Sequence, residues 1–461
     1  MSAAEMGTIG LDIGGTHLRG ARVGADGTIE ARAKDASGPD PQAVLDRCLS
    51  LIARLRTPGA TGIGIGVPGQ VDAASRRVLS GGFVDLSGLD LAARVEAAAG
   101  LPVTLENDAA MALLGEARAG AARGHASAAM LTIGTGIGGA VLEGGRLLRG
   151  GGVAGQLGHM IVPGGGPCVC GRTGCVETAS SGTAFAAHLA RAGLPAGTRA
   201  EELTADDPHG VLRAWAAPLR AAIDTLVAVC NPGLVVIGGG AGAAMARALA
   251  LVPPARSWFD APVVPAALGD DAGVTGAALA ARPAGKRLVI VNGVPASGKS
   301  AVARALADRT GWPLYALDTV KGPFLAALAP VDRPFNRLLG RAAYDAIFDL
   351  LADAPAGATA ILDAWFGFQP VDVLRDGLRR AGIADLAEVW CHAPPEVVGA
   401  RYAARAADRP AGHPGADYVP ELVALARTAR PTGLAEPFRL DTTGPPDLGA
   451  LTAWLRTALP H

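Results

Sequence analysis

Short apolar runs that end in glycine-rich turns recur along the first half of the chain. Residues 8–13 lead into one such turn, and residues 130–133 lead into another. A second strand-like segment follows each turn, at 18–23 and at 138–143, which is the pattern of a hairpin. Because the pattern returns after about 120 residues, it predicts two similar lobes that face each other across a cleft.

A third glycine cluster closes the first half. Gly238 and Gly239 follow the strand-like residues 234–237 and precede a helical stretch at 241–250. This position suits a contact with the base of a nucleotide bound in the cleft. Residues 281–286 then have the character of a linker, because Pro and Gly interrupt the periodicity.

The second half begins with a continuous apolar run at 287–292, which is typical of a buried parallel strand. A glycine loop leads from it directly into a helical segment at 300–309. Further strand-like runs alternate with helical segments, and they lie at 313–317, 359–362, 388–391 and 438–440. This alternation predicts a doubly wound α/β domain. We therefore expect a first domain at 7–282 with lobes at about 7–120 and 121–282, a linker at 283–286, and a second domain at 287–461.

Composition narrows the class of protein. Half of the 461 residues are hydrophobic, 18% are charged and the mean hydropathy is +0.30. The apolar runs are nevertheless too short for the roughly 20 residues of a membrane-spanning helix, and no export signal precedes the first strand. We expect a cytoplasmic protein without a membrane partner. A net charge of −1 provides no basic field that would gather nucleic acid.

Three of the six cysteines cluster together with a histidine. Cys168, Cys170 and Cys175 follow His159 closely, whereas the other three cysteines are scattered. One imidazole and three thiolates complete a tetrahedral zinc shell and leave no position for water. The spacing predicts a structural Zn²⁺ that orders a glycine-rich loop. Three reduced thiols beside a solvated histidine are the alternative.

Two glycine-rich turns have the character of phosphate cradles. Backbone N–H groups can surround a phosphate closely only where no Cβ blocks the approach or forbids positive φ. The first cradle runs from Asp12 through Gly14 and Gly15 to Thr16, and the second runs from Gly293 through Gly298 to Ser300. The chain is therefore expected to bind ATP at two sites and to transfer phosphoryl groups.

The first half resembles the ROK family of sugar kinases and repressors over residues 7–282. The matching segments, in the family's order, are 12–16, 66–69, 106–108, 134–139 and the cysteine segment 154–177. The resemblance implies an actin-like, ribonuclease H-like fold of two lobes with ATP and Mg²⁺ between them. Dimers are frequent among proteins similar to this half, so a homodimer remains open.

The resemblance also implies roles for individual residues. Asp108 becomes the general base that accepts the proton of a sugar hydroxyl, although an aspartate here is also a common helix N-cap. Asp12 would hold Mg²⁺ through water, although it also suits a β-turn. The other implied contacts are Gly69, Asn107, Gln156, His159 and Glu177 for the sugar, and Gly14, Gly15, Thr16, Gly134, Thr135, Gly136, Gly238 and Gly239 for the nucleotide.

Gln156 departs from the family pattern, which usually has a glutamate three residues before the zinc histidine. An amide keeps an acceptor and gains donors while it loses a charge. We expect the recognised pattern of sugar hydroxyls to differ from that of a plain glucokinase.

The second cradle fits the pattern G-x-x-x-x-G-K-S between a strand and a helix. Lys299 is expected to bridge the β- and γ-phosphates, and Ser300 and Asp363 are expected to hold Mg²⁺. Ala364 stands where a hydrolytic motor has a glutamate, which favours transfer to a bound acceptor over hydrolysis. Asp318, at the end of a predicted strand, is a candidate to orient or deprotonate that acceptor, or alternatively a helix N-cap.

Three arginines at a spacing of four residues, Arg401, Arg405 and Arg409, would share one helical face and could close over the transferring group. A solvated stripe explains them as well. Residues 287–461 resemble P-loop small-molecule kinases of the gluconate, shikimate and chloramphenicol type. The acceptor cannot be read from the sequence.

The pattern as a whole favours a fused pair of kinases, with glucose the leading substrate of the first half and an N-acetylhexosamine or fructose its rival. A P-loop half that only senses nucleotide is a second alternative. A sugar-responsive repressor is a third, disfavoured because no DNA-binding helix-turn-helix fits ahead of residue 12.

Overall fold

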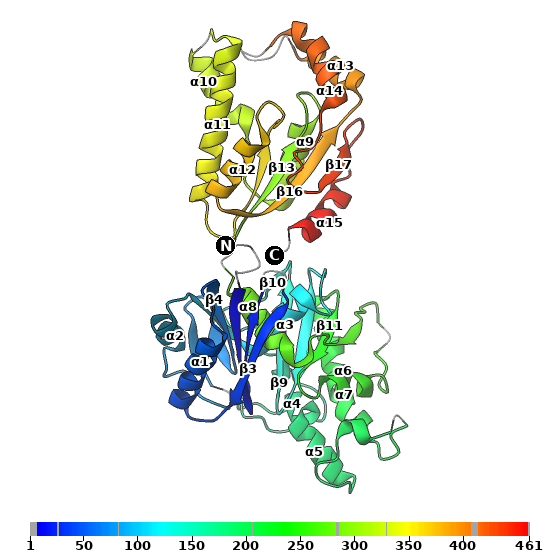
Figure 1. Ribbon diagram of the computed structural model, residues 1–461. Coiled ribbons are helices and arrows are strands. Elements are labelled where there is room, and N and C mark those ends of the chain that lie inside the picture. The colour runs from blue at the N-terminus through cyan, green and yellow to red at the C-terminus, as the bar shows by residue number, and fades with distance from the viewer. Residues whose placement is uncertain are drawn as a thin grey trace. The chain divides into compact units, whose positions relative to one another are not determined.

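The computed structural model describes residues 7–24, 27–81, 83–204, 206–255, 257–282, 285–328, 330–406 and 414–459. The chain forms two compact units, Met1–Arg282 and Pro283–His461, and each is considered by itself (Figure 1). Residues 283 and 284 of the expected linker lie outside the described residues. Lys286 belongs to the first strand of the second unit.

The first lobe is built on a five-stranded sheet with the order β3-β2-β1-β4-β7. The strand β1 pairs antiparallel with β2 and parallel with β4. Apolar side chains of these strands are buried under helices α1 and α2. The elements are β1 (Gly7–Ile13), β2 (His17–Val23), β3 (Ile29–Ala36), β4 (Ala60–Val67), β7 (Val103–Asn107), α1 (Pro41–Leu55), α2 (Leu91–Ala99) and the small hairpin β5 (Gln70–Asp72) and β6 (Arg77–Ser80).

The second lobe repeats this arrangement with the sheet order β10-β9-β8-β11-β12. Its central strand β8 pairs antiparallel with β9 and parallel with β11. The two hairpins predicted from the sequence are thus related by the same strand pairings, and the predicted actin-like fold is confirmed. The strands are β8 (Ala128–Ile133), β9 (Ile137–Glu143), β10 (Arg146–Leu147), β11 (Val235–Gly238) and β12 (Val263–Pro265).

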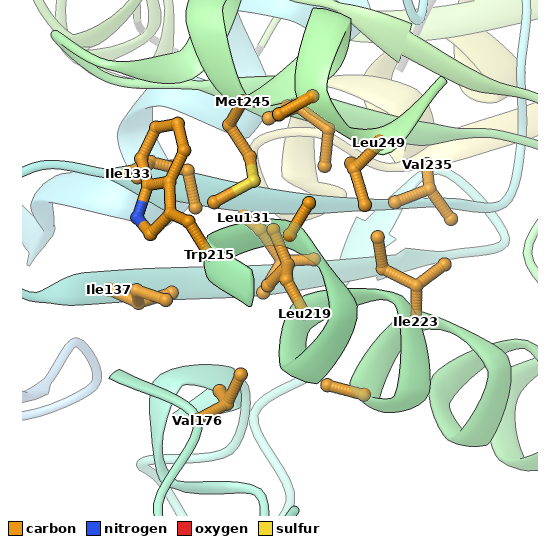
Figure 2. Packing of buried hydrophobic residues seen from close by; sticks show 14 of the residues in the cluster. Leu131, Ile133, Ile137, Val176, Trp215, Leu219, Ile223, Val235, Met245 and Leu249 are labelled. Carbon is orange, nitrogen blue, oxygen red and sulfur yellow. The ribbon is translucent and has the colours of Figure 1, made fainter. Parts of the chain in front are cut away.

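One face of the second sheet packs on the long helix α6 (Val211–Cys230). Figure 2 shows Trp215, Leu219 and Ile223 of this helix against Leu131 and Val235 of the sheet. Apolar residues three and four positions apart in α6 form one stripe, which explains why this face is buried. The remaining helices of the lobe are α4 (Glu177–Ser180), α5 (Gly182–Arg191) and α7 (Gly242–Leu249).

Helices α3 (Asp108–Ala119) and α8 (Ala272–Ala280) pack against each other very closely (Figure 1). A Cβ on Gly276 would lie 1.7 Å from the carbonyl oxygen of Met111, so only glycine permits this approach. Similarly, a Cβ on Gly64 of β4 would lie 1.8 Å from the carbonyl oxygen of Ala277. Residues 272–280, expected within the second lobe, therefore pack on the sheet of the first.

The second unit is a parallel sheet with the order β14-β15-β13-β16-β17 and helices on both faces, as predicted. Helices α11 and α12 cover one face, and α9 and α15 cover the other. The strands are β13 (Lys286–Asn292), β14 (Leu314–Ala316), β15 (Thr359–Asp363), β16 (Ile383–His392) and β17 (Pro437–Asp441). The helices are α9 (Lys299–Thr310), α10 (Leu317–Leu328), α11 (Arg333–Asp353), α12 (Val371–Arg380), α13 (Pro395–Ala404), α14 (Val419–Thr428) and α15 (Leu448–Ala458).

Two boundaries in this unit differ from the prediction. The strand β14 ends at Ala316, so Asp318 lies in the first turn of α10 rather than at the end of a strand. The strand β16 begins at Ile383, five residues before the predicted start at 388, because its first residues, which include the polar Asp385, already pair with β13. Among the helices of the described residues, none is both long and apolar enough to span a bilayer.

Candidate functional site

The first phosphate turn joins β1 to β2, and Asp12 lies within β1 just before it. Asp12 pairs with Arg19 and Gly66 on the neighbouring strands, so the β-turn alternative for this residue is wrong. Its carboxylate lies 3.8 Å from the Arg19 guanidinium. Burial and the nearby Asp108 carboxylate nevertheless raise the pKa of Asp12 to about 7.

Both phosphate turns are closed by a backbone hydrogen bond, which spans two residues in the second turn, between β8 and β9, and three residues in the first. Gly134 N–H donates to the Gly136 carbonyl at 3.0 Å, as Gly14 N–H donates to the His17 carbonyl at 3.0 Å. Gly182 N–H donates to the Gly134 carbonyl at 2.8 Å, and the Thr183 hydroxyl donates to the Thr135 carbonyl at 2.8 Å. Residues at the N-terminus of α5 thus donate hydrogen bonds to the carbonyl groups of this turn.

Gly238 and Gly239 lie beside the second turn. Gly238 of β11 pairs with Thr132 of β8, the residue two positions before Gly134. Gly239 has φ +81°, and a Cβ there would lie 2.6 Å from the backbone nitrogen of Ile133. The structure therefore brings the third glycine cluster to the phosphate turn.

Asp108 is the first residue of α3, and the helix N-cap is its neighbour Asn107. The Asn107 Oδ1 accepts from the backbone N–H groups of Ala109 at 3.0 Å and Ala110 at 3.2 Å. The N-cap alternative for Asp108 is therefore wrong. Burial raises the pKa of Asp108 to about 6, although the Ala109 N–H, which donates to its Oδ1 at 2.8 Å, opposes the shift.

The N-terminus of α3 lies between the two phosphate turns. On the first-lobe side, a Cβ on Gly66 would lie 3.4 Å from the Asp108 Cα, and the charge of Asp108 acts on Asp12. On the second-lobe side, a Cβ on Gly138, two residues after Gly136, would lie 3.1 Å from the Ala109 Cβ. Asp108 is thus positioned at the meeting point of both hairpins.

A small cavity of about 20 Å³ lies next to this point and is bordered by Asn107, Gln156, Glu106 and Arg149. The Asn107 side-chain amide donates to the Gly69 carbonyl at 2.9 Å. Glu106 of the first lobe is buried and pairs with Arg149 of the second lobe, with 2.9 Å between the closest atoms. Asn107 and Gln156, expected to contact one sugar, therefore line one cavity.

His159, Cys168, Cys170 and Cys175 converge as predicted. Their donor atoms all lie within 4.8 Å of one another. The Cys170 and Cys175 sulfurs are 3.5 Å apart, and the His159 Nδ1 is 3.6 Å from the Cys168 sulfur. Zinc bonds of about 2.3 Å in a tetrahedron place sulfurs roughly 3.8 Å apart, so this donor set fits the ion.

Glu177 connects the cysteine cluster with the second phosphate turn. Its Oε1 lies 2.8 Å from the Cys168 sulfur and 3.5 Å from the His159 Nδ1. A Cβ on Gly136 would lie 2.9 Å from its Oε2. Glu177, expected beside the sugar, therefore also lies between the cluster and the phosphate turn.

In the second unit, the glycine loop joins β13 to α9 with positive φ at Gly293, Ala296 and Gly298. Lys299 begins α9, and its Nζ lies 4.0 Å from the Asp363 Oδ1 at the end of β15. Within the described residues, this oxygen is buried and accepts no hydrogen bond. A buried carboxylate oxygen that accepts no hydrogen bond and lies near Lys299 suits the Mg²⁺ expected there.

The positions of Asp318, Arg401 and Arg405 differ from those expected from the sequence. Asp318 lies inside α10, so it is neither a strand end nor an N-cap, and its side chain is 65% exposed. Helix α13 ends at Ala404, and Arg405 follows it as the exposed C-cap. Arg401 donates to the Thr442 carbonyl at 2.7 Å. Arg401 and Arg405 thus do not share one continuous helix, and Arg409 lies outside the described residues.

Comparison with known proteins agrees with this geometry. Residues 8–283 match the family model described as "ROK family", and residues 288–423 match one described as "AAA domain". The chain belongs to the ROK family. The ROK half is followed by a P-loop domain, hereafter the P-loop half.

The relatives of the ROK half are sugar kinases by name. A glucokinase of Streptomyces coelicolor is 33% identical over 60% of this chain and 97% of its own length. An N-acetylmannosamine kinase of Escherichia coli is 34% identical over 60% of this chain and 99% of its own length. The crystal structure of a Streptomyces griseus ROK glucokinase with glucose and AMPPNP covers the same 60% and 99% of its own chain, at 32% identity and a TM-score of 0.54.

Several residues at the ROK site were missed by the sequence analysis. Gly182, Thr183 and Arg149 contribute to it although no motif pointed to them, and the pairing of Glu106 with Arg149 was not expected from the matching segment 106–108. Ser181, which caps α5 through the N–H of Ala184 at 3.2 Å, was the available signal for Gly182 and Thr183. The ion pair had no local signal, because its members lie 43 residues apart.

Proposed function

We propose that the ROK half transfers the γ-phosphoryl group of ATP to the 6-hydroxyl of a hexose, with glucose the leading substrate. The observation that carries this proposal is the position of Asp108, between the two phosphate turns and next to the cavity bordered by Asn107 and Gln156. The names of the relatives support the same chemistry.

Asp108 suits the role of general base. A sugar hydroxyl is a weak nucleophile, so a carboxylate that accepts its proton as the bond to phosphorus forms lowers the barrier. With a pKa raised to about 6, Asp108 is ionised at neutral pH and is also a stronger base than an exposed aspartate. The helix N-terminus below it orients the carboxylate.

The other groups of the ROK site would bind and orient. Asp12 would hold Mg²⁺ through water, and a cation next to two adjacent carboxylates would relieve their repulsion. Gly14, Gly15, Thr16, Thr135 and the neighbouring glycines would surround the phosphates. A structural Zn²⁺ on the cysteine cluster would order the loop that carries His159 and Glu177 to the sugar.

We propose that the P-loop half is a second kinase. Lys299 and Ser300 at the loop, Asp363 with its open oxygen and the following Ala364 suit transfer to an acceptor rather than hydrolysis. Asp318 would orient or deprotonate this acceptor, because its exposed carboxylate follows the strand next to β15.

A rival proposal for the ROK half is an N-acetylhexosamine or fructose kinase, with the P-loop half as a nucleotide sensor. Gln156, in place of the family's usual glutamate, and the N-acetylmannosamine kinases among the relatives favour this rival. A sugar-responsive regulator is a weaker candidate, because it does not require the raised pKa of Asp108.

A coupled assay of ADP release over sugars, sugar acids and small alcohols tests these proposals in the full-length chain. Asp108→Asn is expected to lower sugar-dependent turnover by roughly 10²- to 10⁴-fold, the usual contribution of a general base. Lys299→Ala is expected to abolish a separate, non-sugar activity and to leave sugar turnover intact. The two variants serve as controls for each other.

The outcomes separate the proposals. Full sugar turnover in Asp108→Asn would remove this residue as the base. An N-acetylhexosamine or fructose preferred over glucose would establish the rival substrate. If Lys299→Ala changes no acceptor-dependent activity, the second kinase is refuted.

A further inference from the structure

A cavity of about 170 Å³ lies in the P-loop half, where α11 and α12 approach the carboxyl ends of β13 and β15. Most of its wall is apolar, and the apolar and aromatic members include Tyr344, Phe348, Phe366, Val371, Val373 and Leu374. A cavity of roughly 150 Å³ holds one benzene-sized molecule. The cavity is therefore large enough for a ligand the size of about one six-membered ring.

The polar groups at this cavity are mostly engaged with the protein itself. The Asn292 side-chain amide donates to the buried Glu388 carboxylate at 2.8 Å, and the Thr432 hydroxyl donates to it at 2.6 Å. Arg430 donates to the Ala429 carbonyl at 2.8 Å. A sugar acid could pair its carboxylate with the Arg430 guanidinium, but it would leave most of its hydroxyls unpaired in such a site, which is costly. Gln369 adds one neutral amide.

The cavity is directly connected to the phosphate loop. The Asn292 Oδ1 accepts from the Gly293 N–H of the loop at 2.8 Å and from the Phe366 N–H of the cavity wall at 3.4 Å. Phe366 follows Asp363 by three residues. A ligand in the cavity would thus lie beside the loop that carries Lys299.

Tyr344 connects the cavity with both candidate carboxylates. Its hydroxyl donates to the Trp365 carbonyl at 2.6 Å. Burial raises the pKa of Tyr344, and the charges of Asp318 and Asp363 raise it further. The cavity, the proposed base and the proposed Mg²⁺ ligand are therefore electrostatic neighbours.

We propose that this cavity is the acceptor site of the P-loop half and that it takes a neutral alcohol with an apolar, ring-sized body. The inference rests on the proposed second kinase. The alcohol oxygen bonds to the γ-phosphorus of the nucleoside triphosphate while the bond to the β–γ bridging oxygen breaks. The diphosphate leaves with that electron pair, and the hydroxyl proton passes to the Asp318 carboxylate.

The two halves would then act on different chemical classes. The ROK cavity has an amide pair and an ion pair within a lining that is otherwise aliphatic, whereas the wall of the P-loop cavity contains three aromatic side chains. Successive action of the two halves on one free sugar is excluded by this proposal.

The test uses the full-length chain with 2-phenylethanol, cyclohexylmethanol and gluconate as probes. Binding is followed by saturation-transfer NMR, and turnover is followed by ADP release. Val373→Trp fills the cavity from α12, where Val373 is 40% exposed, so the fold can accept the larger side chain. Leu350→Trp is the control, since Leu350 of α11 is 49% exposed and lies outside the cavity wall.

We expect the two ring alcohols to bind to wild type and to Lys299→Ala, and Val373→Trp to weaken their binding by about tenfold or more. Leu350→Trp is expected to bind as wild type does. Lys299-dependent ADP release should rise with the ring alcohols and not with gluconate.

Two results would overturn the inference and a third would overturn its premise. Absent ring-alcohol binding, or binding that Val373→Trp leaves unchanged, refutes the assignment of the cavity. Lys299-dependent turnover of gluconate that resists Val373→Trp refutes the acceptor class while the second kinase stands. Ring-alcohol binding without Lys299-dependent turnover of any acceptor refutes the second kinase, and the acceptor role with it.

Discussion

The ROK half and the P-loop half both place an aspartate near the carboxyl end of a parallel strand, but the two carboxylates meet different charges. Asp12 is adjacent to a second carboxylate, Asp108, and the pKa of each is raised. Asp363 instead faces the ammonium group of Lys299 at 4.0 Å. Asp12 also has a cation nearby, because the Arg19 guanidinium lies 3.8 Å from it. The two halves therefore differ in the second carboxylate beside Asp12 rather than in the presence of a basic side chain.

The halves also differ in what orders their loops. The glycine loop of the P-loop half joins a strand directly to a helix within one sheet. The loop at 160–176 of the ROK half contains isolated bridges and many glycines, and a metal on its cysteine cluster would hold it together. A loop with little apolar burial needs such a clip, so we expect only the ROK half to require a structural metal.

Removal of the metal should have the largest effect. Cys175→Ser, at a buried position, is expected to abolish bound zinc and to lower sugar-dependent turnover by roughly 10²-fold or more, as loss of a structural zinc unfolds its site. Metal analysis and ADP release measure this. Cys230→Ser is the matched control, and unchanged turnover in zinc-free Cys175→Ser would contradict the structural role.

The pH dependence of sugar turnover tests the carboxylate pair. Because the pKa of Asp108 is raised to about 6, its base form is lost as the pH falls through this value. We expect kcat/KM for the sugar to fall toward tenfold per pH unit below about pH 6. A pH–rate profile that stays flat down to pH 5 would exclude Asp108 as the base.

The free energy of unfolding of the ROK half should show the cost of the buried Asp12 charge next to Asp108. The folded pKa of Asp12 is about 7 against 3.8 for an exposed aspartate, so the folded state binds its proton more tightly and loses stability as the pH rises from about 4 to 7. Asp12→Asn should raise the free energy of unfolding by on the order of 1–2 kcal/mol at pH 8 and by less at pH 5. Urea unfolding without added Mg²⁺ measures this.

The exposed Asp46 of α1 supplies the control for that experiment. Asp46→Asn should change stability little at either pH. If Asp12→Asn is no more stable than wild type at pH 8, the buried and repelled Asp12 charge costs no stability and the contrast with Asp363 disappears.

The smallest effect concerns specificity. Gln156→Glu restores the family's usual charge in the sugar cavity and is expected to change the ranking among hexoses by a few-fold, about 1 kcal/mol. Steady-state kinetics over a hexose panel checks this, with Gln42→Glu on α1 as the control. An unchanged ranking would remove Gln156 as a specificity determinant.

The sequence by itself determined the fold class and most of the site. These features are local patterns, which residues close together in the sequence are enough to define. They are the two hairpins, the glycine loop before Lys299 and the cluster of His159 with three cysteines. Residues such as Asp12 and Asp363 were identified for the same reason, because each ends or nearly ends an apolar run.

Tertiary structure decided which of these groups meet and how charge is distributed among them. The raised pKa of Asp12 depends on burial and on Asp108, which lies 96 residues away in the chain but at the same edge of the sheet. The Glu106–Arg149 pair, the contact of α8 with the first lobe and the apolar cavity beside Asn292 are likewise long-range. Such contacts follow from packing between distant segments, and no single stretch of sequence encodes them.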